Sequence, residues 1–580
     1  MIKKLAASIR EYKKQSILAP LTVSLEVVME VIIPLLMAKL IDKGIEAGDM
    51  SYILKMGGIL CLCCLLSLAF GVMAGKYAAV ASSGYAHNLR RDLYYRVQDF
   101  SFSNIDKFST ASLVTRLTTD VTNIQNAYQM IIRIAVRAPL MLVFAVIMAM
   151  SISVRLSTIY LCIVPVLALG LYLIMSKAHP VFRKMFKMYD HMNNVVQENL
   201  YGVRVVKSYV REEHEDKKFS DVSNDIYRTA TRAERIVALN NPLMIACIYG
   251  CLLLISWFGA KLIISTGGSE LTTGELMSFI NYAMQILSSL LMVAMIFLMI
   301  VMSRASAERV LEVLEETSDL TSPQNALTEV PDGSVRFENV GFSYAGREDK
   351  LCLSGVNLDV PSGATVGVLG GTGSSKSTLV QLICRLYDVT QGRLLVGGHD
   401  VREYDLEALR NAVAVVLQKN VLFSGTIKEN LRWGNPEATD EELVHACRLA
   451  AADEFVNTFP DGYDTYIEQG GTNVSGGQKQ RLCIARALLK KPRILILDDS
   501  TSAVDTATDA RIRQAFREEI PETTKFIIAQ RIASVQDADL IVVLDGGRVT
   551  DAGTHAELLA RSPIYREVYE SQMKGGSDDE

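Results

Sequence analysis

Six apolar stretches, each long enough to cross a bilayer as a helix, constrain the fold of this chain most strongly. About 20 helical residues span a hydrocarbon core. The stretches occupy residues 17–42, 53–80, 128–150, 154–177, 241–265 and 274–303. Because 49% of the 580 residues are hydrophobic, a membrane-embedded portion is expected. Residues 1–315 are therefore predicted to form an α-helical membrane domain with six spans.

Basic residues indicate how these spans are oriented. Lys and Arg are frequent before the first span and in the polar segments 81–127 and 178–240. The three other connections, 43–52, 151–153 and 266–273, contain one basic residue, Lys43. The positive-inside rule then places both termini in the cytoplasm of a multi-pass protein of the cell membrane. Both polar segments also have periodic apolar residues, which predict long cytoplasmic extensions of the membrane helices.

Two acidic residues, Glu26 and Glu30, lie near the middle of the first span. Their spacing places them on one helix face, and each would cost about 2.5–3.5 kcal/mol if it faced lipid. They are expected either to line a path for a cationic or polar substrate or to form a packing pair with Arg133 or Arg137. Transport of a cationic dye by a Glu26→Gln, Glu30→Gln variant separates these alternatives.

Composition argues against two other classes of function. The net charge of -5 is small and spread along the chain, so no basic face suited to nucleic acid is expected. The ten cysteines have neither metal-ligand spacing nor a disulfide-like pattern, which indicates free thiols.

The second half of the chain changes character. A polar, proline-containing segment, 316–334, is expected to be a linker, 335–572 a soluble α/β domain, and 573–580 a disordered tail. An apolar strand pattern at 364–370 leads into GGTGSSKST, which differs from the phosphate loop G-x-x-x-x-G-K-[ST] only at Ser375. The predicted phosphate-binding residues are Gly370, Gly371, Thr372, Gly373, Ser374, Ser375, Lys376, Ser377 and Thr378.

Two further motifs support a nucleotide site. The apolar run RILILDDSTSAVD at 493–505 contains Asp498, placed as a magnesium-side carboxylate, followed by Asp499. The segment VSGGQKQR precedes it at 474–481. Taken alone, each motif could be an ordinary turn or strand end. Their order and spacing together argue against coincidence and favour a nucleotide site.

With these motifs in this order, the chain resembles the ATP-binding cassette (ABC) family. Six spans followed by one P-loop cassette is the half-transporter arrangement of ABC exporters. The resemblance implies ATP and Mg²⁺ as cofactors, with Ser377, Gln418 and Asp498 on the metal. It also implies an adenine contact at Tyr344, short coupling helices within 101–108 and 199–209, and a second homologous subunit. The signature and D-loop residues would be Ser475, Gly476, Gly477, Gln478 and Asp505.

Three residues depart from the family pattern at one site. Ser375 replaces a glycine, Asp499 takes the place of a catalytic glutamate, and Gln530 takes the place of a switch histidine. A misplacement of about 1 Å can cost on the order of 10²-fold in rate, and a glutamine cannot carry a proton as an imidazole can. The site is thus expected to bind ATP and hydrolyse it poorly, as in heterodimeric bacterial multidrug-type exporters, with an intact signature completing the partner's site.

Some other functions are compatible with these motifs, and some are not. A homodimeric exporter of lipid or peptide with slow ATPase, or an ATP-gated channel or regulator, fits the same motifs. A soluble mechanical ABC ATPase would not need six spans, and an importer normally keeps its membrane subunits on separate chains. The sequence predicts efflux of a small or amphipathic substrate and leaves drugs, lipids and peptides open.

Overall fold

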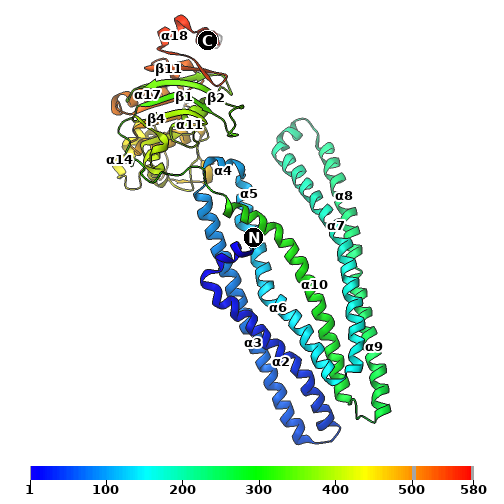
Figure 1. Ribbon diagram of the computed structural model, residues 1–580. Coiled ribbons are helices and arrows are strands. Elements are labelled where there is room, and N and C mark those ends of the chain that lie inside the picture. The colour runs from blue at the N-terminus through cyan, green and yellow to red at the C-terminus, as the bar shows by residue number, and fades with distance from the viewer. Residues whose placement is uncertain (1, 500–503, 576–580) are drawn as a thin grey trace. The chain divides into compact units, whose positions relative to one another are not determined.

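The computed structural model describes residues 2–499 and 504–575, and the chain forms two compact units. The first unit comprises Met1–Gln98 and Thr110–Glu316, and the second comprises Asp99–Ser109 and Thr317–Glu580. The expected first domain, 1–315, is therefore interrupted, because residues 99–109 pack as part of the second unit. Each unit is visible in Figure 1.

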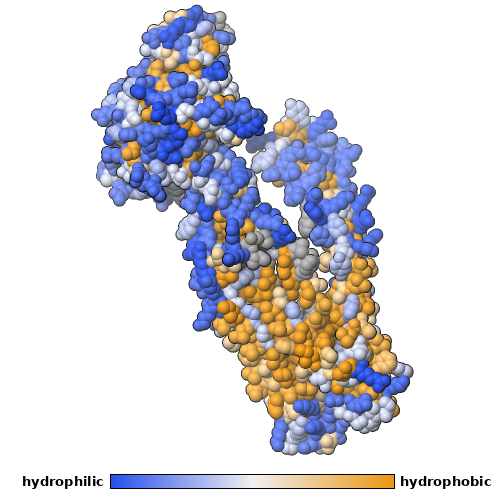
Figure 2. Space-filling model, viewed as in Figure 1, coloured by the Kyte–Doolittle hydropathy of each residue, from blue (hydrophilic) through white to orange (hydrophobic). Residues whose placement is uncertain are grey.

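The first unit is helical, and six of its helices within the described residues are long and apolar enough to cross a membrane. This confirms the predicted six-span class, and Figure 2 shows the apolar surface over these helices. The main helices are α2 (Lys13–Leu40), α3 (Met50–Gln98), α6 (Val121–Ile152), α7 (Val154–Ser208), α8 (Glu212–Val237), α9 (Asn240–Thr266) and α10 (Thr273–Glu315). The shorter elements are α1 (Ile2–Ala6), η1 (Ala7–Tyr12), η2 (Ile41–Ile45), α5 (Thr110–Thr115) and η3 (Arg116–Asp120).

Side chains of α10 donate hydrogen bonds to backbone carbonyls of α2 at and before a proline. Pro34 has no N–H, so the carbonyl of Glu30 loses its helical donor. Gln285 of α10 donates to that carbonyl at 3.5 Å, and Tyr282 donates to the Val31 carbonyl at 2.8 Å. Ser278 donates to the Pro34 carbonyl itself. The bond from Gln285 pairs the one carbonyl that Pro34 leaves without a helical donor, which would be costly where water is excluded. The bonds from Tyr282 and Ser278 add to the contact between the two helices.

Aspartates from two π-helical turns bind the two ends of α10. Asp42 of η2 accepts from the Gly274 amide at 2.8 Å and from the Thr272 hydroxyl at 2.6 Å, at the start of α10. Asp120 of η3 accepts from Arg309 Nε at 2.8 Å, near its other end. π-Helical turns often occur at functional positions, and here each turn presents a carboxylate to the same helix.

The second unit is an α/β domain, as predicted. A six-stranded sheet has the order β12-β11-β3-β10-β9-β6, and a four-stranded sheet has the order β2-β1-β4-β5. Two further strands, β7 and β8, form a small pair. The strands are β1 (Val335–Phe342), β2 (Leu353–Val360), β3 (Thr365–Gly370), β4 (Gln391–Val396), β5 (His399–Asp400), β6 (Val413–Val416), β7 (Gly425–Thr426), β8 (Tyr466–Ile467), β9 (Ile494–Asp498), β10 (Thr524–Ile528), β11 (Leu540–Asp545) and β12 (Arg548–Gly553).

Helices of this unit include one segment that lies far upstream in the sequence, α4. The helices are α4 (Phe102–Lys107), α11 (Lys376–Ile383), α12 (Leu406–Ala412), α13 (Ile427–Arg432), α14 (Asp440–Leu449), α15 (Asp453–Val456), α16 (Gly476–Leu489), α17 (Thr506–Glu519), α18 (His555–Arg561) and α19 (Pro563–Gly575). The segment 316–334 is not a free linker, because Leu327 bonds to the backbone of Glu403 and Asp405, both at 2.9 Å. Residues 573–575 of the expected tail belong to α19, and 576–580 lie outside the described residues.

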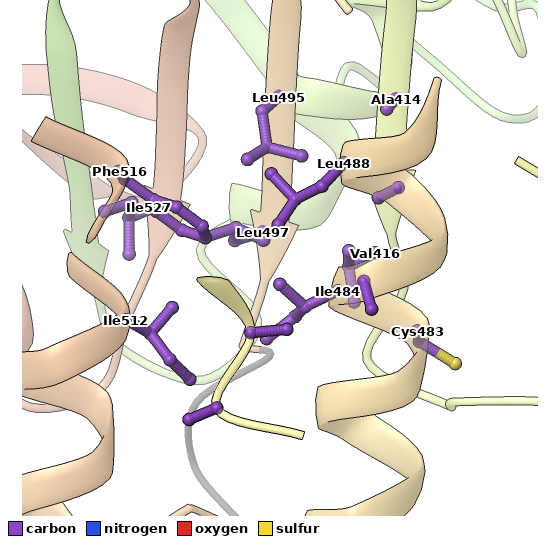
Figure 3. Packing of buried hydrophobic residues seen from close by; sticks show 14 of the residues in the cluster. Ala414, Val416, Cys483, Ile484, Leu488, Leu495, Leu497, Ile512, Phe516 and Ile527 are labelled. Atoms are coloured by element: carbon purple, nitrogen blue, oxygen red, sulfur yellow. The ribbon is translucent and has the colours of Figure 1, made fainter. Parts of the chain in front are cut away.

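The central strands are buried on both faces, which is typical of parallel strands covered by helices. All five residues of β9 and of β10 are buried. On one face, Ile484 and Leu488 of α16 pack near Leu495 and Leu497 of β9 (Figure 3). α11 covers the other face, together with the four-stranded sheet. The parallel pairing of β3, β10 and β9 brings their carboxyl ends to one edge, where the polar residues of the site follow.

Candidate nucleotide site and its family

The phosphate loop joins β3 to α11. A Cβ at Gly370 would lie 2.3 Å from the carbonyl oxygen of Leu544, so only glycine fits there. Ser375 has φ +70°, a left-handed conformation that glycine adopts freely and serine does not. The replacement of glycine by serine therefore keeps the loop conformation at a cost in backbone strain. The side chain of Lys376 crosses the loop and donates to the carbonyls of Gly370 and Gly371, both at 2.8 Å.

A cavity of about 240 Å³ lies beside this loop. It brings together residues that are separated by more than 150 positions in the sequence. Its lining is Thr372, Gly373, Ser374, Ser375, Lys376, Ser377, Thr378, Gln418, Asp498, Asp499, Ile528 and Gln530. Most of the phosphate loop and all the predicted metal and hydrolysis residues therefore share one cavity.

Ser377 and Asp498 form the part of this cavity that is suited to a divalent cation. The Ser377 hydroxyl donates to Asp498 Oδ1 at 2.9 Å. Burial raises the pKa of Asp498, while the hydroxyl bond opposes the rise. Burial also lowers the pKa of Lys376, against the attraction of the two neighbouring aspartates. A cation and a phosphate group would relieve both desolvated charges, and the hard oxygen donors of this pair suit Mg²⁺.

Asp499, in the position where the family has a glutamate, is held by two amides. Gln530 Nε2 donates to Asp499 Oδ2 at 2.8 Å, and Gln418 Nε2 lies 3.4 Å from the same oxygen. Asp499 has φ +48°, so its backbone is also in the left-handed region. Gln572 of α19 holds the backbone of Gln530, because its side-chain amide donates to the Gln530 carbonyl at 2.8 Å. No motif in the sequence indicates the role of Gln572.

Tyr344 lies at the border of the site and not in the cavity lining. Its hydroxyl is 2.9 Å from the Thr378 hydroxyl, at the start of α11. Its ring meets Phe342 edge-on, with centroids 4.8 Å apart. The residue is 55% exposed, so part of its surface is accessible to a planar ligand. This placement suits the predicted adenine contact.

The signature residues form a separate feature, the N-terminus of α16. Ser475 caps the helix: it accepts from the Gln478 amide at 3.2 Å, and the Gln478 side chain accepts from the Ser475 amide at 2.9 Å. Gly476 and Gly477 complete the first turn, and none of the four lines the phosphate-loop cavity. Asp505 caps α17 through the Thr508 amide at 2.9 Å, while its neighbours 500–503 lie outside the described residues.

The acidic pair in α2 has a partner in α6. Arg137 donates to Glu26, and also to both oxygens of Glu30 at 2.7 and 2.8 Å. The Glu26 carboxylate lies against Gly71, where a Cβ would approach Oε1 to 3.2 Å. Arg133 and Arg137 were both predicted partners, and the described ion pairs involve Arg137 and not Arg133.

No group of three or more His, Cys, Asp or Glu residues within the described part of the chain could hold a metal ion by itself. A cation at this site would therefore depend on Ser377, Asp498, Gln418 and ligand oxygens. A six-span helical unit joined to a phosphate-loop α/β domain with a capped SGGQ helix defines an ATP-driven membrane transporter.

The chain belongs to the ABC transporter family. Residues 16–291 match the ABC transporter transmembrane region, and residues 353–502 match the ABC transporter domain. An uncharacterized ABC transporter ATP-binding protein of Bacillus subtilis, YfiB, is 37% identical over 564 residues, which cover 97% of each chain. A fatty acid ABC transporter ATP-binding/permease protein of Mycobacterium bovis is 35% identical over 480 residues, 83% of this chain and 75% of that one.

A solved structure extends the likeness to three dimensions. The structure of a bacterial Atm1-family ABC exporter with ATP bound superposes with a TM-score of 0.81 at 26% identity, over 97% of this chain and 98% of that one. The predicted class is thereby confirmed: the chain is a multi-pass ABC exporter half-transporter, with a membrane domain fused to one cassette. Such exporters are dimers that couple ATP hydrolysis to transport.

Proposed function

We propose that this chain is the subunit of a heterodimeric exporter whose own phosphate-loop site holds Mg²⁺ and ATP but hydrolyses the nucleotide slowly. The observation that carries the proposal is the position of Asp499. Its side chain is one methylene shorter than that of glutamate, and Gln530 and Gln418 direct amide groups at one of its oxygens. A general base must reach the proton that it abstracts, and here two donors compete for the carboxylate.

Binding of the nucleotide needs other residues, which this chain retains. Lys376 would exchange its two carbonyl acceptors for phosphate oxygens, and the N-terminus of α11 would face the same group. Ser377, Asp498 and Gln418 would hold Mg²⁺, which supplies charge neutralisation on the phosphates. Tyr344 would stack on adenine. Ser375 preserves the loop path and adds a hydroxyl.

In the same proposal, the signature of this chain acts in the partner's site. Ser475, Gly476 and Gly477 present a hydroxyl and backbone amides at a helix N-terminus, which is suited to a terminal phosphate. The partner would contribute the phosphate loop, the glutamate and the histidine of that site. Asp505 at the start of α17 would lie in the D-loop between the two sites.

The proposed substrate is small or amphipathic. A cavity of about 230 Å³ between α6 and α10 is lined by Met141, Met284 and Met292 beside Arg137 and Ser288. Thioether side chains adapt to ligands of different shape, which suits an amphipathic molecule, and the Mycobacterium relative is named for fatty acids. We assign the Glu26 and Glu30 pair to packing with Arg137, not to the substrate path. The proposed location is a bacterial cell membrane with both termini in the cytoplasm.

Purification of the complete transporter from its native membrane tests the proposal. A second, homologous subunit is expected to co-purify, and ATPase activity is expected to require it. A Ser475→Ala variant of this chain should lower turnover by on the order of 10²-fold, as for loss of a donor that stabilises transition-state charge. The matched control, Ser377→Ala in the site that turns over slowly, should lower it much less.

Two outcomes would contradict this assignment. Steady ATPase and transport from this chain alone would indicate a homodimer with two slow sites. Uptake into inverted vesicles that stops when the gradient is level would indicate an ATP-gated channel, because only a pump moves substrate against a gradient.

A further inference from the structure

The segment Asp99–Ser109 connects α3 to α5 of the membrane unit, yet it folds as part of the cassette unit. α4 begins at a Ser101 cap that is reinforced by Asn104, which is only 5% exposed. Asn104 Nδ2 donates to the Thr317 carbonyl at 3.2 Å, and Ser103 donates to Asp319 at 2.8 Å. The segment is thus bound to the cassette by specific polar contacts at its first turn.

Tyr387, which follows α11, contacts α4 through both its hydroxyl and its ring. Its hydroxyl donates to Asp106 Oδ2 at 2.7 Å, and its ring lies 6.1 Å from the ring of Phe102. Burial, and secondarily the bond to Asp106, raise the pKa of this phenol. The hydroxyl therefore keeps its proton across the physiological range and remains a donor to the carboxylate.

The ring of Tyr387 also contacts Tyr344, the proposed adenine contact. Tyr387 meets Tyr344 edge-on, with centroids 5.2 Å apart, and it is 5.5 Å from Phe342. Tyr344 is in turn bonded to Thr378 on the phosphate-loop helix. Edge-to-face pairs of aromatic rings have a preferred geometry. A change in the plane of the Tyr344 ring therefore changes the energy of the Tyr387 pair.

We propose that Tyr387 is a positioning residue that links nucleotide occupancy of this chain's own site to α4, through Tyr344 on one side and Asp106 on the other. A base that stacks on Tyr344 fixes the ring plane, which selects one position of the Tyr387 ring and so one position of Asp106. α4 continues covalently into α3 and α5, so the site acts on the membrane helices even where it hydrolyses nothing. The inference rests on the proposed function only in the assignment of Tyr344 to adenine.

The two contacts of Tyr387 predict a specific pattern of coupling. The ring contacts belong to the nucleotide side, while the hydroxyl contact belongs to the α4 side. Tyr387→Phe keeps the ring and removes only the bond to Asp106, and Asp106→Asn weakens the same bond from the other partner. Because both variants remove one interaction, their effects should not add.

Hydrogen exchange in the complete transporter, with and without ATP, tests the link without an activity measurement. In the unmodified protein, ATP is expected to slow amide exchange in residues 99–109. In Tyr387→Phe most of this slowing should be lost, while the ATP affinity of this chain, measured by photolabelling with an azido-ATP, stays within about threefold. Asp106→Asn and the double variant should give the same loss. Tyr404→Phe is the matched control, since it removes a buried hydroxyl bond to the Val396 carbonyl at 2.8 Å elsewhere in the cassette, and it should leave the response intact.

The result that overturns the inference is an ATP response of 99–109 that is equal in the unmodified protein and in Tyr387→Phe, or absent from both while the label is bound. An additive double variant overturns it as well, because the two side chains would then act separately. Failure of the proposed nucleotide-holding role is recognised separately, since this chain would then not take the label at all.

Discussion

Asp499 and Gln530 form a pair at the ends of two adjacent parallel strands, β9 and β10. Aspartate in place of glutamate shortens the reach of the carboxylate, and glutamine in place of histidine supplies an amide that binds this carboxylate at 2.8 Å. In the proposed function the two departures act together, because the amide of Gln530 holds a carboxylate with a shortened reach. Gln530→His alone would leave the short reach of Asp499, and Asp499→Glu alone would leave Gln530 as a competing donor.

Reversion of both residues is expected to create a second hydrolysing site. The variant Asp499→Glu, Gln530→His should raise ATP turnover at this chain's phosphate loop by on the order of 10²-fold, because a reoriented base and a titratable imidazole return together. ATPase assays of the complete transporter carrying Ser475→Ala, which silences the partner's site, isolate the gain. An unchanged rate would mean that Ser375 or another feature limits hydrolysis.

At the scale of helices and strands, the parts of the site that are local in sequence could be predicted. The strand, loop and helix around Lys376 follow from an apolar run, glycines and helical periodicity, and the cap at Ser475 follows from its spacing to Gln478. The long-range contacts could not be predicted, because they depend on how elements pack. Examples are Tyr387 on Asp106 and Gln572 on Gln530, each of which needs both partners in place.

The intramembrane cluster shows the same limit. The spacing of Glu26 and Glu30 predicts a shared face, but two arginines one turn apart on α6 were equally available partners. The structure joins Arg137 to both carboxylates and thereby links α2 to α6. The relative register of α2 and α6 determines which arginine reaches the carboxylates. The sequence of either helix alone does not determine that register.

Removal of Arg137 should destabilise the helical unit more than removal of the whole cluster. Arg137→Gln leaves two carboxylates in an apolar setting and should cost about 3–5 kcal/mol, whereas the triple variant with Glu26→Gln and Glu30→Gln should recover most of that loss. Thermal unfolding midpoints of the solubilised transporter measure both, with Arg133→Gln as control. Impaired transport of a cationic dye in the folded Glu26→Gln, Glu30→Gln variant would instead assign the pair to the substrate path.

At the scale of the whole transporter, one intact signature and one altered catalytic set within the same chain imply two sites with different tasks. In the proposed heterodimer, the altered site keeps the groups that hold a nucleotide and lacks those that position water. In the proposed dimer, the intact signature does not contact the nucleotide on this chain's own phosphate loop. It contacts the nucleotide on the partner's phosphate loop. The dimer would thus hold one nucleotide for long periods and turn over the other.

Trapping with vanadate should reveal this asymmetry. After incubation with Mg²⁺ and ATP, trapped ADP is expected on the partner's phosphate loop, while this chain retains intact ATP, because γ-phosphate cleavage needs a base that Asp499 does not supply. Photolabelled nucleotide on each separated chain gives the distribution. Equal trapping on both chains would contradict the division of tasks. In the Asp499→Glu, Gln530→His variant, trapped ADP should appear on this chain too, which would attribute the asymmetry to these two side chains and not to the partner.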